Sequence, residues 1–289
     1  MNVRTGWTIL FTAATALTCI AAAPAAIDWQ TDYNAALALA VEQNKPLMVY
    51  FGGDWCPWCD KMRDEVHTDA AVIETLSAFV SVTLVAEDNS ELAQRLGFDG
   101  GIPATAFIMP DETVLQLVVG YRAAPLFDVI AKQAIATVPK LDGLKVLWQA
   151  YTDQTATLAQ AAELLTFCNR SDQSARARQL VEYIDERITE ELAPPESYLL
   201  DRPIALLNAD SEAPPLDQFK TWVESHDSEH ARYYEALYWY GLAVAYSRDL
   251  DGAEATWKAV TEKVPDTIWG KYAQLYLDLV AQIRGGQPE

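Results

Sequence analysis

The chain has 289 residues, which is enough for about two domains of ~150 residues each. Hydrophobic residues make up 51% and charged residues 21%, a composition that excludes a disordered or fibrous protein. The 21 Lys and Arg against 41 Asp and Glu give a net charge of −20, which argues against binding to nucleic acid or to an anionic membrane surface.

The first 25 residues are predicted to be a secretory signal peptide. Arg4 precedes an apolar stretch of small residues, 7–23, and Ala23-Pro24-Ala25 offers an A-x-A cleavage pattern. The alternative is a membrane anchor, because the stretch is close to the roughly 18 residues that a spanning helix needs. Its many small residues favour cleavage. We therefore expect an exported, periplasmic protein without a membrane anchor, in a compartment that permits disulfides.

Residues 26–138 alternate helical and strand patterns, which predicts an α/β domain with a mixed sheet. The continuous apolar run 47–51 is typical of a buried central strand. Pro110-Asp111-Glu112 predicts a hairpin turn between the last two strands. The expected strands cover residues 47–51, 79–85, 105–109 and 113–119. The expected helices begin near residues 32, 56, 69, 90 and 124.

Beyond residue 138 the strand patterns stop, so residues 139–289 are predicted to form a separate all-α domain. Residues 236–265 resemble one tetratricopeptide repeat. Because one repeat cannot bury its own face, we expect the helices over 141–188 to stack as degenerate neighbours and residues 269–283 to cap the array. The residues at the offsets expected for the repeat are Gly241, Ala253, Trp257 and Pro265.

A group of tyrosines in this helical half has two interpretations. They line a concave surface that binds a peptide or protein partner, or they belong to the core between packed helices, since any buried helix face needs such spacing. These residues are Tyr233, Tyr234, Tyr238 and Tyr240.

The sequence Trp55-Cys56-Pro57-Trp58-Cys59 carries the clearest chemical signal. It follows a predicted strand and opens a helix, where unpaired N–H groups and the helix dipole favour a thiolate. The thiolate is the nucleophile of thiol–disulfide exchange, and a cysteine one turn later can resolve the mixed disulfide. The pair is therefore predicted to be redox-active, with a permanent structural disulfide and a zinc site as the two alternatives.

A zinc site would need a second pair of ligands at a matching spacing. Cys168 is alone among apolar residues and is predicted to be a buried core thiol. His67, His226 and His230 show no matching spacing, and the last two lie four apart in a stretch that indicates a solvated helix junction. We therefore predict no metal ligands and no bound cofactor.

Residues 29–134 resemble the thioredoxin-like superfamily, and more closely its secreted or periplasmic branches, such as the C-terminal domain of DsbD. The resemblance implies an α/β thioredoxin-like fold over residues 26–138, in which helices flank a mixed sheet, followed by an all-α, tetratricopeptide-like domain over 139–289. The segments that carry the likeness are 45–51, 54–62 around the two cysteines, 97–105 and 119–121.

The resemblance also implies roles for residues around the cysteines. Cys56 would be the attacking nucleophile and Cys59 the resolving thiol. Pro103 would be a cis-proline facing the disulfide, with Ile102 presenting its backbone to an extended substrate; the alternative is an ordinary trans proline in a loop. Trp55 and Trp58 would form an apolar rim around the sulfur atoms; the alternative for Trp58 is that it packs on the closing helix.

Two paired positions depart from the family. Thioredoxins carry a buried acid six residues before the first cysteine, paired with a lysine on the next strand, and the acid helps to deprotonate the resolving thiol. Tyr50 and Thr83 occupy these positions here. The residues that could replace the acid are Asp54, Asp60 and Glu65.

These observations predict an exported thiol–disulfide oxidoreductase that acts on protein or peptide thiols and disulfides. Pro57 and Trp58 between the cysteines lack the histidine of the strongest oxidants in the superfamily, so reduction or interchange is favoured over primary oxidation. Another thiol protein would supply or accept electrons, and the helical domain would dock a protein partner. The alternative is a non-catalytic interaction scaffold whose cysteines form a structural disulfide.

Overall fold

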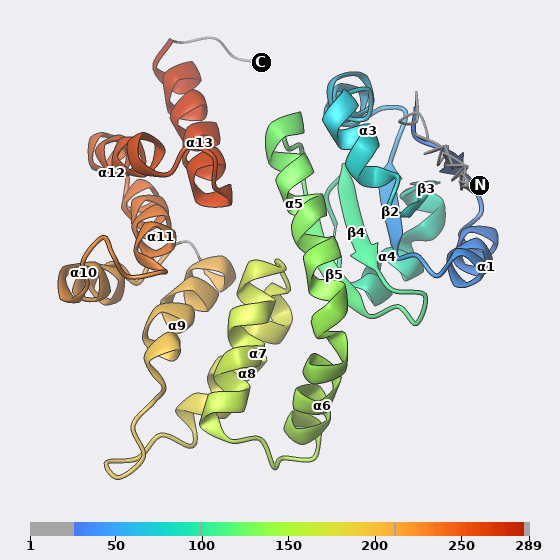
Figure 1. Ribbon diagram of the computed structural model, residues 1–289. Coiled ribbons are helices and arrows are strands. Elements are labelled where there is room, and N and C mark those ends of the chain that lie inside the picture. The colour runs from blue at the N-terminus through green and yellow to red at the C-terminus, as the bar shows by residue number, and fades with distance from the viewer. Residues whose placement is uncertain (1–25, 99, 211, 286–289) are drawn as a thin grey trace, which may run out of the picture.

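The computed structural model describes residues 26–98, 100–210 and 212–285, so the predicted signal peptide lies outside the described residues. An α/β part comes first and is followed by helices alone (Figure 1). This arrangement confirms the predicted fold class, a mixed sheet with helices followed by an all-helical region.

The five described strands form one sheet in the order β1-β3-β2-β4-β5. The central strand β2 pairs with β3 in parallel and with β4 antiparallel, and all six of its residues are buried, as its apolar run predicts. The two-residue strand β1 was not predicted, because so short a segment shows no alternating pattern. The strands are β1 (Trp29–Gln30), β2 (Leu47–Gly52), β3 (Val80–Val85), β4 (Ala104–Ile108) and β5 (Val114–Val119).

Helices cover both faces of the sheet because successive side chains of a strand point to opposite sides. Val49 and Phe51 of β2 share a core with α1 and α4, whereas Met48 and Tyr50 share a core with α3 and α5. Helix α2 continues directly into a π-helical turn, Met62–Val66. The helices of this part are α1 (Tyr33–Gln43), α2 (Pro57–Lys61), α3 (Ala70–Leu76), α4 (Ser90–Leu96) and α5 (Ala124–Thr137).

The helical region follows a 3-10 turn, Val138–Lys140, which is where the domain boundary is predicted. Prolines and polar residues separate its helices, as the sequence predicts. None of the described helices is both long enough and apolar enough to cross a membrane. The helices are α6 (Leu141–Thr152), α7 (Leu158–Arg170), α8 (Ser174–Asp185), α9 (Glu196–Ala209), α10 (Leu216–Ser225), α11 (Tyr233–Tyr246), α12 (Leu250–Lys263) and α13 (Ile268–Gly285).

Within this region, α11 and α12 pack closely. Gly241 of α11 makes room for the Trp257 ring of α12, since a Cβ at this glycine would lie 2.7 Å from Trp257 Nε1. The Trp257 Nε1–H donates to the Tyr238 carbonyl oxygen at 3.2 Å. Tyr238 is buried and its ring lies 5.5 Å from that of Trp269, so this tyrosine belongs to the core. The tetratricopeptide-like character of the region stays a prediction.

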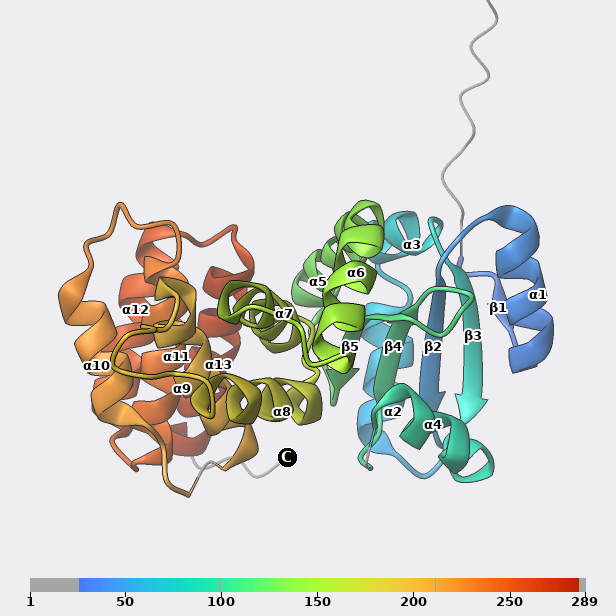
Figure 2. The same ribbon diagram turned by 90° about the horizontal axis from the view of Figure 1, so that it is seen from below.

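The two parts share a continuous apolar core. One cluster joins Phe107 and Ile130 of the α/β part to Leu144 and Leu164 of the helical region. The edge strand β5 is also covered, because the Leu117 N–H donates to the carbonyl oxygen of Ser171 at 3.0 Å, just after α7 (Figure 2). An uncovered edge strand would be free to pair with another chain, so the helical region protects the sheet.

Candidate active site

The two cysteines lie where the central strand ends and a helix begins. Gly53, directly after β2, lets the side chains of Ile102 and Trp55 come close to the backbone. A Cβ at this position would lie 3.2 Å from both Ile102 Cδ1 and Trp55 Nε1. Cys56 is the N-cap residue of α2, and its backbone is extended while Pro57 starts the helix. A proline fits at this position because the first helical turn leaves its N–H groups unpaired. The strand end and the cap thus fix the place of the first cysteine.

Cys56 and Cys59 form a disulfide with a Cα–Cα distance of 5.2 Å. The Cys59 backbone N–H donates to Cys56 Sγ at 3.1 Å. A hydrogen bond from an N–H to sulfur favours the charged form, and the N-terminal end of the helix adds a positive potential. In the reduced protein this contact would stabilise a thiolate on Cys56.

A third segment reaches the disulfide from the loop before β4. The Ile102–Pro103 peptide bond is cis, rather than the trans bond of the alternative interpretation. The Ile102 carbonyl oxygen lies 3.7 Å from Cys56 Sγ. Gly100 and Gly101 precede it with φ values of 137° and 83°, which L side chains rarely adopt, so the turn depends on glycine. The structure brings Ile102 and Pro103 beside the cysteines, and their role toward substrate stays a prediction.

Two tryptophans border the nearly buried disulfide. Trp55 is 70% exposed and Trp58 is 45% exposed, whereas Cys56 and Cys59 are 3% and 2% exposed. The Trp55 Nε1–H donates to Glu87. The Trp58 ring lies 5.6 Å from that of Tyr121, so it packs against the segment that precedes α5. Both rings therefore offer apolar surface next to the sulfur atoms.

A family model described as thioredoxin-like matches residues 28–110. The N-terminal domain is thioredoxin-like. Among solved structures, a thioredoxin from Thermus thermophilus is 28% identical, with 40% of this chain and 93% of that chain covered and a TM-score of 0.37. A DsbH oxidoreductase is 24% identical, with 34% of this chain and 79% of that chain covered and a TM-score of 0.30. A search of curated proteins finds no significant match.

A thioredoxin-like domain with a Cys56–Cys59 disulfide supports a redox enzyme in general. The polar groups around Cys59 differ from the family pattern described above. Tyr50 and Thr83 are register partners on β2 and β3, and with Cys59 they line a cleft of about 360 Å³. The Tyr50 hydroxyl donates to the Cys59 carbonyl oxygen at 3.4 Å, and burial raises the pKa of Tyr50 to about 12. Tyr50 is therefore neutral near pH 7 and is no base.

The three carboxylates suggested as replacements for the missing acid have different surroundings. Asp60 forms an ion pair with Arg63. Glu65 accepts a hydrogen bond from the Tyr121 hydroxyl at 2.7 Å. Asp54 lines the cleft beside Cys59. A second carboxylate, Asp88, lines the same cleft, although no spacing along the chain connects it with the cysteines.

His67 is a buried group at this site that sequence reasoning missed. Its ring lies 4.8 Å from that of Tyr50 and 5.0 Å from that of Trp29, and its Nε2 has no hydrogen-bond partner among the described residues. Burial, with a smaller contribution from the positive charge of Arg63, lowers the pKa of His67 to about 4. His67 is thus a neutral ring packed against Tyr50 of β2, and no pattern around position 67 indicated this contact.

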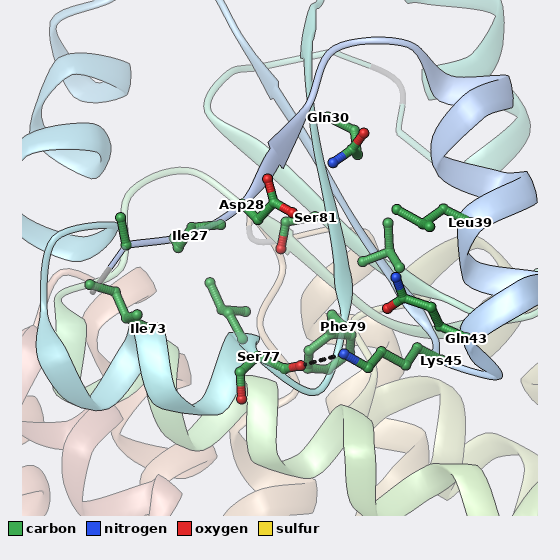
Figure 3. A pocket seen from close by; sticks show the side chains of 13 residues that line it. Ile27, Asp28, Gln30, Leu39, Gln43, Lys45, Ile73, Ser77, Phe79 and Ser81 are labelled. Atoms are coloured by element: carbon green, nitrogen blue, oxygen red, sulfur yellow. Dashed lines mark hydrogen bonds between the residues drawn. The ribbon is translucent and has the colours of Figure 1, made fainter. Parts of the chain in front are cut away.

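The thioredoxin-like domain has a second, smaller cavity at the opposite end of its strands. It has a volume of about 190 Å³ and lies where β2 and β3 begin, whereas Cys56 follows the end of β2. Lys45 Nζ at its border donates to the Ser77 carbonyl oxygen at 2.9 Å (Figure 3). This cavity is therefore separate from the cysteine site.

Cys168 is the remaining described cysteine. It is fully buried in α7, which confirms the predicted core thiol. Burial raises the pKa of its thiol to about 12, with a small opposing effect of Arg176. A thiol in these surroundings stays protonated and unreactive at neutral pH.

Proposed function

We propose that the protein is an exported thiol–disulfide oxidoreductase that reduces or interchanges disulfides of proteins or peptides. The observation that carries this proposal is the position of Cys56 Sγ, which accepts the Cys59 N–H at 3.1 Å and lies 3.7 Å from the Ile102 carbonyl oxygen. A stabilised thiolate next to a free backbone segment has what disulfide exchange needs, namely a nucleophile and a place to bind an extended chain.

The reduced protein would react in two steps. The Cys56 thiolate attacks one sulfur of the substrate disulfide, forms a mixed disulfide and releases the other substrate sulfur as a thiolate, which takes up a proton. Cys59 then loses its proton and attacks Cys56 Sγ, which forms the Cys56–Cys59 disulfide and frees the second substrate thiol. Two electrons pass from the protein to the substrate, and a dithiol partner protein returns the oxidised pair to the reduced state.

Substrate binding is proposed for the backbone of Ile102 and Pro103 and for the rings of Trp55 and Trp58. The support is geometric: the disulfide is nearly buried, so a substrate disulfide approaches it past these groups. Exposed tryptophan rings next to a reactive group offer apolar contact area at little cost in side-chain entropy.

Asp54 is proposed as the proton acceptor of Cys59. It replaces the buried acid of thioredoxins, whose position Tyr50 occupies, and it lines the same cleft as Cys59. Water in this cleft would connect the carboxylate with the thiol. Asp88 lines the cleft as well and would take this role when Asp54 is removed.

Export to the periplasm and docking of a partner on the helical region complete the proposal. Export is supported by the pattern of residues 1–25 in the sequence alone. Docking is supported by the half-buried side chain of Tyr233 on α11, since Tyr238 of the same group is buried in the core and Tyr234 and Tyr240 pack against it.

A trapping experiment tests the function. The Cys59→Ala variant should accumulate mixed disulfides between Cys56 and substrate, because the resolving thiol is gone. The control is the Cys56→Ala, Cys59→Ala double variant, which keeps Cys168 and should trap nothing. If Cys59→Ala forms no mixed disulfide with insulin or a peptide disulfide, the scaffold with a structural disulfide becomes the better description.

A further inference from the structure

Three side chains from two segments of the helical region converge away from the cysteine site. Glu196 is the first residue of α9, and His226 and His230 lie in the connection between α10 and α11. His226 Nε2 is 3.2 Å and His230 Nε2 is 3.4 Å from the same carboxylate oxygen, Oε1 of Glu196. All three potential ligand atoms lie within 4.8 Å of one another.

Two of the three separations fit the geometry of a bound zinc ion, and the third, between the ligand atoms of the two histidines, is at most 4.8 Å. Ligands about 2.0 to 2.1 Å from a tetrahedral zinc lie about 3.3 to 3.4 Å from each other. The two distances from Glu196 Oε1 equal this edge length within 0.2 Å. Two imidazoles and one carboxylate also form a ligand set that zinc accepts in proteins, with a fourth position left for water.

His226 is already oriented as a metal ligand. Its Nδ1 lies 2.8 Å from the Trp222 carbonyl oxygen, which can only accept, so Nδ1 carries a proton. Its Nε2 faces Glu196 Oε1 at 3.2 Å, and a metal ion between them would take the place of a proton on Nε2. The Trp222 indole stacks on the imidazole with ring centroids 3.9 Å apart and planes at 15°. A hydrogen bond from the second ring nitrogen and a packed ring are the features that hold a metal-binding histidine in place.

His230 supports the same site with one rearrangement. Its Nδ1 accepts the Arg232 N–H at 3.2 Å, so its proton is on Nε2 and faces Glu196. Coordination through Nε2 would move this proton to Nδ1 and break the long hydrogen bond from Arg232. Metal binding therefore exchanges two hydrogen bonds for one coordination bond at this residue.

We propose that Glu196, His226 and His230 form a zinc-binding site that clamps the α10–α11 connection to the start of α9. The side chains of His226, His230 and Glu196 are 18%, 31% and 67% exposed, so an ion and its water can enter from solvent. The sequence did not indicate this site, since Glu196 precedes His226 by 30 residues and only the fold brings it to the histidines.

Calorimetric titration of the oxidised protein with zinc chloride tests the site. The Cys56–Cys59 disulfide removes both thiols as competing ligands, and Cys168 is fully buried. We expect one zinc ion per chain. His226→Ala and Glu196→Gln should each weaken binding by more than about 100-fold, the upper end of what loss of an outer partner costs. The control Glu224→Gln changes an exposed carboxylate of the same junction and should bind zinc as the unchanged protein does.

Cobalt(II) provides a second measurement that needs no variant. Cobalt in a tetrahedral site should give strong visible absorption bands, which added zinc should abolish. Circular dichroism of each variant separates loss of a ligand from loss of the fold. No saturable binding, or the same affinity in Glu196→Gln as in Glu224→Gln, would overturn the proposal. Either result leaves the proposed redox function unaffected, because the two sites share no residue.

Discussion

Each of the two regions of the molecule contains a buried cysteine sulfur, Cys56 in the thioredoxin-like domain and Cys168 in the helical region, and the surroundings of these two sulfur atoms differ. Their exposed fractions are 3% and 0%, so burial hardly distinguishes them. Cys56 caps a helix and receives an N–H at 3.1 Å. Cys168 lies within α7 among apolar side chains, and its pKa is raised to about 12. The position within a helix and the neighbouring dipoles, rather than burial, decide which sulfur can react.

The same contrast holds for charge. Beside the cysteines of the thioredoxin-like domain, the carboxylates are half exposed or line a cleft. The helical region instead buries Asp201 and Glu235 completely or nearly so, and Arg232 Nη2 binds both, at 2.7 and 2.8 Å. Burial opposes ionisation of Glu235, but hydrogen bonds and charge from Arg232 and Arg170 outweigh it and lower the pKa of Glu235. The carboxylates beside the cysteines thus stay open to solvent, whereas the buried carboxylates of the helical region hold helices together.

The largest effect on activity is expected from replacing each of the two cysteines separately with serine. Cys56→Ser should lower reduction of insulin to the background rate of the reductant alone, because the nucleophile is lost. Cys168→Ser should keep full activity. Turbidity or fluorescence assays of insulin reduction measure both rates. Activity that depends on Cys168 would contradict the proposed difference in reactivity between the two cysteines.

The buried ion network should give the largest loss of stability. Arg232→Ala leaves Asp201 and Glu235 buried without their main partner, and removing one side of a buried pair costs about 3 to 5 kcal/mol. The control is Arg202→Ala, which breaks the half-exposed pair with Asp185 and should cost less than about 1 kcal/mol. Urea unfolding gives both free energies, and equal losses would mean that burial of the network adds nothing.

His67 should make the stability of the thioredoxin-like domain pH-dependent. Its folded pKa of about 4 lies below the ordinary value, so the unfolded chain takes up the proton first as pH falls. This contribution to stability is complete above pH ~6.5 and declines toward pH ~4, by up to about 3 kcal/mol. Chemical unfolding at several pH values should show that the difference in free energy of unfolding between wild type and His67→Phe changes with pH. A pH-independent difference would contradict it.

The smallest effect is expected at the rim of the site. Trp58→Ala removes a ring that is 45% exposed, and it should raise KM for a peptide disulfide several-fold, about 1 kcal/mol, with little change in kcat. Val146→Ala changes an exposed side chain of α6 and is the matched control. Steady-state kinetics of both variants measure KM and kcat. A larger increase of KM in Val146→Ala than in Trp58→Ala would indicate that the substrate binds to the helical region.

Much of the fold follows from local patterns in the sequence. The run Leu47–Phe51 is long and wholly apolar, and it forms the central strand; Pro57 and the two cysteines mark a helix start, and this is where α2 begins. The absence of strand patterns after residue 138 predicts the helical region. Strand β1 was missed, because two residues carry no period.

Less of the site could be predicted, because contacts between distant segments have no local pattern. Local patterns in the sequence were enough to predict the redox pair of cysteines, its position at the start of a helix and the burial of Cys168. Only the tertiary structure placed Ile102 beside Cys56, His67 behind Tyr50 and Glu196 against two histidines. Periodicity and capping act over a few residues along the chain, whereas the packing that joins these groups depends on how whole elements meet.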